Sequence, residues 1–126
     1  MKWDNVEAVI FDLDETLIDA QLGLSAAHNR VIGIFHGLLE RKKVKMSHAE
    51  LIEAMKKFDD DMNRRLIYDR DLWWQDFADK MALGIRLPQS VVGQLSKEYW
   101  DAYEEGAIPY PDAIETLLYL NDKDYC

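Results

Sequence analysis

The first apolar segment of the chain is a short run that indicates a buried strand. Residues 6–11 read Val-Glu-Ala-Val-Ile-Phe, so Glu7 is the one polar residue among β-branched and other apolar side chains. Such a run is typical of a strand buried on both faces, as in a parallel sheet. It ends in Asp12-Leu13-Asp14-Glu15-Thr16-Leu17, where polar and apolar residues alternate. The pattern predicts a strand over residues 6–11 that leads into a polar loop.

After Asp19 the apolar positions recur every three or four residues for almost 90 residues, which predicts four helices. Ser47 and Glu50 form a capping box that begins the second helix. Asp71 is expected to cap the third helix, which Gly84 ends, and Pro88 suits the first turn of a fourth that stops at Gly106. The apolar faces comprise Leu24, Ala27, Val31, Ile34 and Leu38; Leu51, Met55, Phe58, Met62 and Leu66; Trp73, Trp74, Phe77 and Met81; and Val92, Leu95, Tyr99, Ala102 and Tyr103.

Two details of this helical block carry further expectations. Gly33 and Gly37 are four residues apart on the first helix, which favours close packing against a neighbouring helix. Trp73 and Trp74 are adjacent, and two adjacent residues do not share one helix face. We therefore expect one of these two indoles to be exposed.

A proline-rich segment separates the helical block from the end of the chain. Residues 108–111 read Ile-Pro-Tyr-Pro, and each proline disfavours helix in the residue before it. Asp112 is expected to cap a last short helix over residues 113–120. The chain is thus predicted to hold one strand, four helices, an extended hinge and a fifth helix.

Charge and cysteine content narrow the function classes. The formal net charge of the 126 residues is −9 and no basic stripe offsets it, which argues against nucleic-acid binding. An anionic substrate would need local donors or a metal cation. The one cysteine is Cys126, so an internal disulfide is excluded, and the N-terminus has no signal-like apolar core. No apolar run approaches the ~20 residues that cross a bilayer, so we expect no membrane span and a cytoplasmic location.

Asp12 and Asp14 are the candidate catalytic pair. Two carboxylates two residues apart, directly after a buried strand, can be aimed at one small volume, where they repel unless a cation or a proton intervenes. One of them, ionised beside a metal, can attack phosphorus, while the other protonates the leaving oxygen. The amide N–H groups of the loop, those of Leu13 and Asp14, can hold phosphate oxygens. A calcium loop also begins Asp-x-Asp, but it requires Gly at its sixth position and Glu at its twelfth, where this chain has Leu17 and Gly23.

Residues 9–19, Val-Ile-Phe-Asp-Leu-Asp-Glu-Thr-Leu-Ile-Asp, closely resemble the first motif of the haloacid dehalogenase superfamily. Residues 108–113 and 117–120 are similar to the segment by which chains with an inserted cap re-enter the core. The overall sequence pattern most resembles that of phosphatases of the phosphoglycolate or archaeal glyceraldehyde-3-phosphate type. The resemblance implies an α/β, Rossmannoid core: its first strand and catalytic loop in residues 1–19, a four-helix cap in 20–107, and a hinge and return helix in 108–126.

The resemblance also implies roles for single residues. Asp12 matches the nucleophile that forms an aspartyl-phosphate, and Asp14 matches the general acid and base. The Asp12 carboxylate and the Asp14 backbone carbonyl match the Mg²⁺ ligands, and Thr16 matches the residue that braces the loop. Glu15 replaces the commoner Gly, so we expect its side chain to point away to solvent. Asp14 favours phosphate esters, because the dehalogenases of the family lack this second aspartate.

The expected function is a Mg²⁺-dependent phosphatase that acts on a small phosphorylated metabolite. A 2-haloacid dehalogenase and a non-catalytic helical interaction module are the alternatives. The family completes its site with a Ser/Thr, a Lys and an acidic pair on later strands, and no residue here matches them, Lys123 included. We therefore expect a truncated chain, inactive alone. Its strand needs neighbours, and pairing between two copies, as in a homodimer, is one source of them.

Overall fold

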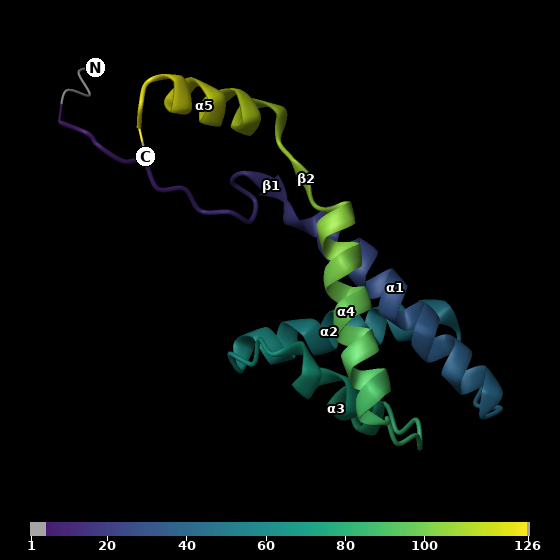
Figure 1. The fold of residues 1–126 in the computed structure, drawn as a ribbon. Coiled ribbons are helices and arrows are strands. Elements are labelled where there is room, and N and C mark those ends of the chain that lie inside the picture. The colour runs from purple at the N-terminus through teal and green to yellow at the C-terminus, as the bar shows by residue number, and fades with distance from the viewer. Residues whose placement is uncertain (1–4, 126) are drawn as a thin grey trace.

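The structure is a computed structural model that describes residues 5–125 and is mostly helical. Within these residues the elements follow the order β1, α1, α2, a 3₁₀ turn, α3, α4, β2 and α5 (Figure 1). Their bounds are β1 Ile18–Asp19, α1 Ala20–Arg41, α2 His48–Arg64, the 3₁₀ turn Arg70–Leu72, α3 Trp73–Lys80, α4 Gln89–Gly106, β2 Ile108–Pro109 and α5 Pro111–Asp122. The prediction of five helices is confirmed.

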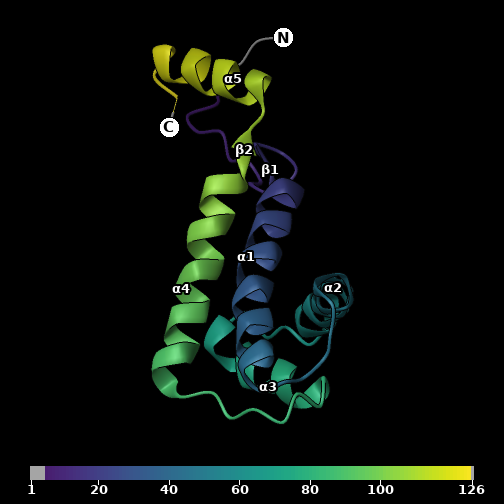
Figure 2. The ribbon, with the colours of Figure 1, turned by 90° about the vertical axis from the view of Figure 1, so that its right-hand side faces the viewer.

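Strands β1 and β2 form a narrow connection between two ends of the molecule. They pair antiparallel, with Ile18 opposite Pro109 and Asp19 opposite Ile108. On one side of this pair α1 and α4 run side by side in opposite directions, with α2 and α3 packed near their far ends (Figure 2). On the other side lie α5 and the described residues of the N-terminal segment, from residue 5 onward (Figure 1). The loop that follows residue 11 therefore lies at the β end of the α1–α4 pair.

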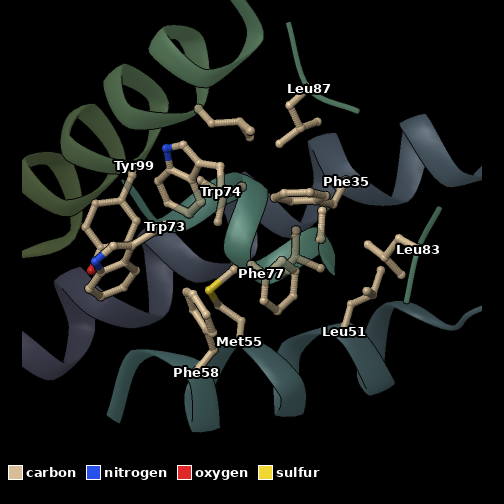
Figure 3. Packing of buried hydrophobic residues seen from close by; sticks show 14 of the residues in the cluster. Phe35, Leu51, Met55, Phe58, Trp73, Trp74, Phe77, Leu83, Leu87 and Tyr99 are labelled. Atoms are coloured by element: carbon tan, nitrogen blue, oxygen red, sulfur yellow. The ribbon is translucent and has the colours of Figure 1, made fainter. Parts of the chain in front are cut away.

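The hydrophobic core lies within the block formed by α1, α2, α3 and α4. Phe77 of α3 is at its centre, with ring centroids 5.1 Å from Phe35 of α1 and 5.4 Å from Phe58 of α2 (Figure 3). These edge-to-face arrangements suit the quadrupoles of aromatic rings. The four helices thus form one packed unit, and α5 adds only Ala113 to the buried apolar residues.

Trp73 and Trp74 are both fully buried, so the expectation that one of them is exposed is wrong. The indole N–H of Trp73 donates to the Ile67 carbonyl at 2.8 Å, and that of Trp74 donates to the Ser96 hydroxyl at 2.8 Å. Helix α3 contacts both α2 and α4, so two different faces of it are covered. Adjacent residues can both be buried on a helix that is enclosed on two sides.

Helix ends agree with the sequence at some positions and not at others. The capping box of Ser47 and Glu50 is present, and α4 ends at Gly106 as predicted. The predicted cap at Asp71 is wrong, because the side chain of Asp69 accepts from the Asp71 amide and begins the 3₁₀ turn instead. Helix α3 ends at Lys80, before the predicted Gly84.

Close helix packing involves other glycines than the predicted Gly33 and Gly37. A Cβ at either of these positions would meet nothing within 4 Å, so that expectation is wrong. Instead, a Cβ at Gly106 of α4 would lie 2.7 Å from the Ala26 Cβ, and one at Gly23 would lie 3.0 Å from the ring of Tyr103. Helices α1 and α4 therefore approach most closely at the end next to β1 and β2.

The predicted strand over residues 6–11 is absent: the described part of this segment forms no ladder, and Ile10 is 95% exposed. A strand of a parallel sheet needs neighbours to bond its backbone. Among residues 5–125 the strands are β1 and β2, which pair with each other. Apolar side chains of α5 are exposed as well, namely those of Ile114, Leu117, Leu118 and Tyr119. No helix among the described residues is long and apolar enough to span a membrane.

Candidate functional site

The loop after residue 11 is a tight turn closed on the carbonyl of Leu13. This oxygen accepts from the amides of Thr16, Leu17 and Ile18 at 3.3, 2.9 and 3.2 Å. The Glu15 amide donates to the Ile18 carbonyl at 2.9 Å. These bonds hold Asp14 in a parallel bridge with Ile18, directly before β1. The turn thereby fixes the backbone on which both candidate carboxylates are carried.

Glu15 adopts a left-handed backbone with φ of 58°. This region is strained for residues with a Cβ and is readily adopted by glycine. The geometry of the turn accounts for the glycine that the related motif commonly has at this position. Here the Glu15 side chain offsets the strain by accepting from the Gln21 amide and from the Tyr110 hydroxyl, each at 3.1 Å. Glu15 is exposed, as expected, but its side chain is held by these two hydrogen bonds instead of extending freely into solvent.

The predicted site residues lie within this single turn. The Thr16 hydroxyl donates to Asp12 Oδ2 at 3.4 Å, a long hydrogen bond that joins the two ends of the turn. Asp12 and Asp14 are both exposed. The amide N–H groups of Leu13 and Asp14 donate to no acceptor among residues 5–125. One short segment thus carries two exposed carboxylates and two amides without an acceptor among residues 5–125.

Two tyrosines that the sequence did not assign to the site, Tyr103 and Tyr110, contact the turn. The hydroxyl of Tyr103, on the last turn of α4, donates to Asp14 Oδ1 at 3.1 Å. The hydroxyl of Tyr110, just after β2, donates to Glu15 at 3.1 Å. Tyr103 follows Tyr99 by four residues on the apolar face of α4, which suggested a core role. The feature of the sequence that could have placed Tyr103 near the loop is its position in the last turn of this helix, next to the segment that returns to the loop.

Both phenols are held in their protonated, donating form. Burial raises the pKa of Tyr103 to about 12, and the hydrogen bond to Asp14 and the charges of Asp14 and Glu15 act in the same direction. Burial followed by the hydrogen bond to Glu15 raises the pKa of Tyr110. Removing a proton next to a carboxylate is unfavourable because it places two negative charges together. At neutral pH both hydroxyls therefore donate.

The residues of the turn suit Mg²⁺ in kind. Carboxylate and carbonyl oxygens are the ligands that Mg²⁺ prefers, and it is commonly held by one or two carboxylates together with water and substrate phosphate. Asp12 and Asp14 supply such oxygens. No group of three or more His, Cys, Asp or Glu side chains that could hold a metal occurs in the part of the chain that the structure describes. The turn therefore supplies oxygen atoms of the kind that Mg²⁺ prefers, without a cluster of three protein side chains around one position among the described residues.

Comparison with known families identifies the chain. The sequence model of the haloacid dehalogenase-like hydrolases matches residues 6–126, almost the whole length. The chain therefore belongs to the haloacid dehalogenase-like hydrolase family, whose members typically depend on Mg²⁺. The match implies the haloacid dehalogenase-like fold and a hydrolase, in agreement with the resemblance of the first motif. No curated protein and no solved structure shows a significant match.

Proposed function

We propose that this chain carries the nucleophile loop and the cap of a Mg²⁺-dependent phosphatase that hydrolyses small phosphorylated metabolites. The observation that carries the proposal is the turn closed on Leu13, from which Asp12 and Asp14 both reach solvent beside two unbonded amides. Family membership supports hydrolysis. The second carboxylate supports an ester substrate, because an alkoxide leaving group requires a proton.

In the first step Asp12 is the nucleophile. A carboxylate oxygen of Asp12 forms a bond to phosphorus while the bond from phosphorus to the ester oxygen breaks. The proton of the Asp14 carboxyl passes to that oxygen, so the leaving group departs as a neutral alcohol. The amides of Leu13 and Asp14 would donate to the phosphoryl oxygens, where negative charge is spread in the transition state.

In the second step the same two residues exchange roles with water. Asp14, now a carboxylate, takes a proton from a water molecule as the oxygen of that water attacks phosphorus. The bond between phosphorus and Asp12 breaks, which releases inorganic phosphate and restores the Asp12 carboxylate. The proton returned to Asp14 makes it an acid for the next cycle. Thr16, whose hydroxyl donates to Asp12, would hold the nucleophile in place between the steps.

Repulsion between Asp12 and an anionic substrate requires a cation. Magnesium, when bound, supplies positive charge that offsets this repulsion and the charge of the transferred phosphoryl group. The Asp12 carboxylate and the Asp14 backbone carbonyl would hold it. The net charge of −9 gives no attraction at long range, so binding depends on these local groups. We also propose a cytoplasmic location, where small phosphorylated metabolites occur.

Phosphate release by the full-length gene product tests the proposal. It would be assayed on p-nitrophenyl phosphate and glycerol phosphate, with and without Mg²⁺. Turnover should require Mg²⁺ and fall at least about a thousandfold in Asp12→Asn, which removes the nucleophile. Glu7→Gln removes the same charge from an exposed position five residues earlier and serves as the matched control.

Three results would contradict the proposal. The first is equal turnover by Asp12→Asn and the wild type. The second is release of halide from 2-chloropropionate without release of phosphate from either ester, which would favour the dehalogenase. The third is a folded protein with no turnover on any of these compounds, which would favour a non-catalytic interaction module.

A further inference from the structure

The hydrogen bond between Tyr103 and Asp14 joins the helical cap to the proposed general acid. Their side chains are 89 positions apart in the chain, and the phenol donates to Asp14 Oδ1 at 3.1 Å. Helix α4 belongs to the helical block, whereas Asp14 lies in the loop before β1. From this geometry we propose that Tyr103 is a positioning residue that fixes the Asp14 carboxyl for proton transfer. The inference rests on the proposed phosphatase function.

Close packing of α1 against α4 holds the Tyr103 ring in place. Gly23 of α1 lies so near this ring that an added Cβ would be 3.0 Å from two of its carbons. Three residues beyond Tyr103, an added Cβ on Gly106 would be 2.7 Å from the Ala26 Cβ. Trp100 packs edge-on against the same ring, with centroids 5.8 Å apart. The phenol is therefore carried by a rigid helix end rather than by a mobile loop.

A fixed phenol limits what the Asp14 carboxyl can do. A free carboxyl rotates about its terminal bond with little preference. A hydrogen bond to Oδ1 selects one orientation and leaves Oδ2 for the proton that the ester oxygen receives. Proton transfer requires donor and acceptor within hydrogen-bond reach, so an unfixed carboxyl transfers less often. Tyr103 would thus matter most where the leaving group needs a full proton.

Tyr110 provides a matched comparison on the same turn. Its hydroxyl also donates at 3.1 Å to a carboxylate of the turn, but to Glu15, which has no role in proton transfer. Both tyrosines therefore tie the turn to a neighbouring element, and only Tyr103 contacts the proposed acid. Loss of the Tyr110 hydroxyl should loosen the turn without discriminating between leaving groups.

The experiment compares Tyr103→Phe and Tyr110→Phe in the full-length protein. Phenylalanine retains each ring and removes only the hydroxyl. The substrates are glycerol phosphate, whose alkoxide needs a proton, and p-nitrophenyl phosphate, whose phenolate leaves without one. In Tyr103→Phe we expect kcat on glycerol phosphate to fall about tenfold and kcat on p-nitrophenyl phosphate less than about twofold. Tyr110→Phe should affect both esters by the same factor.

Equal losses on the two esters in Tyr103→Phe, or no loss on either, would overturn the inference. A second readout does not need turnover: the ¹³C carboxyl resonance of Asp14 should shift in Tyr103→Phe and stay in place in Tyr110→Phe. An unchanged Asp14 resonance in Tyr103→Phe also overturns it. If the wild type releases no phosphate, both the phosphatase proposal and the catalytic effect of Tyr103 are contradicted. The Asp14 resonance then still decides whether the Tyr103 phenol orients the Asp14 carboxyl.

Discussion

His28 of α1 and Asp59 of α2 form a buried polar pair, with Nε2 of the imidazole 2.7 Å from Oδ2 of the carboxyl group. The residues are 6% and 4% exposed, so water does not replace this contact. The Tyr99 hydroxyl donates to the same Oδ2 at 3.4 Å, and Arg70 donates to Tyr99 at 3.3 Å. One carboxyl group therefore links α1, α2 and α4 inside the block that carries Tyr103.

Asp59→Ala should destabilise the protein by about 3 kcal/mol, because it leaves the imidazole and the phenol buried without their partner. Urea unfolding followed by tryptophan fluorescence measures this change. Asp60→Ala removes the neighbouring exposed carboxylate and should change the free energy of unfolding by less than about 0.5 kcal/mol. Equal losses in the two variants would show that burial of the pair contributes nothing.

The sequence predicted this helical block well, but it did not reveal how polar groups are arranged inside it. The apolar spacing predicted α1, α2 and α4 because each of these helices buries a stripe of apolar side chains against the core. Arg70 lies between Asp69 and Asp71 in the sequence, yet its side chain is buried. It is 8% exposed, with its guanidinium carbon 3.7 Å from the centroid of the Trp73 ring. A cation over an aromatic face depends on contacts between separate elements, and a periodic pattern contains no record of them.

In the candidate site, too, the sequence predicted features that are local in the chain but not the contacts between separate elements. Asp12 and Asp14 could be proposed from their spacing after an apolar run, and Thr16 from the family resemblance, because all three lie within one five-residue segment. The contacts of Tyr103 and Tyr110 with the turn span 89 and 95 positions, so they depend on how α4 and β2 return to it. The buried strand over residues 6–11 was predicted from a local run of apolar residues, which does not reveal whether neighbouring strands are there to bond it.

Glu15 allows the strain of the turn to be measured. Glu15→Ala removes both hydrogen bonds of the side chain and keeps a Cβ at φ of 58°, whereas Glu15→Gly removes the same bonds and relieves the strain. We expect the glycine variant to be more stable than the alanine variant by about 1 kcal/mol. This order is the reverse of that within helices, where alanine is favoured. Thermal unfolding of both variants checks it, and a more stable alanine variant would contradict a left-handed Glu15.

Gly106→Ala tests the close approach of α1 and α4. The new Cβ would lie 2.7 Å from that of Ala26 and 3.0 Å from the Leu22 carbonyl, so the helices must separate. We expect a loss of about 1–3 kcal/mol in the free energy of unfolding. Adding Ala26→Gly removes the contact with the Ala26 Cβ and should restore part of this loss. The rescue should be incomplete, because the contact with the Leu22 carbonyl remains. Gly93→Ala, also on α4, meets nothing within 4 Å and should stabilise by about 0.5–1 kcal/mol.

Ionisation of Tyr99 should lower the stability of the protein at alkaline pH. Burial, followed by the charge of Asp59, raises its pKa to about 12 in the folded state, against an ordinary value of 10.0. A raised pKa means that the folded state keeps the proton more tightly, so the contribution is complete below pH 10 and is lost as pH rises toward 12. In chemical unfolding between pH 8 and pH 11.5, the wild type should therefore lose more stability than Tyr99→Phe. Their difference should shrink by about 1 kcal/mol per pH unit above pH 10. A gap that stays constant across this range would mean that the Tyr99 phenol ionises as readily in the folded protein as in the unfolded chain.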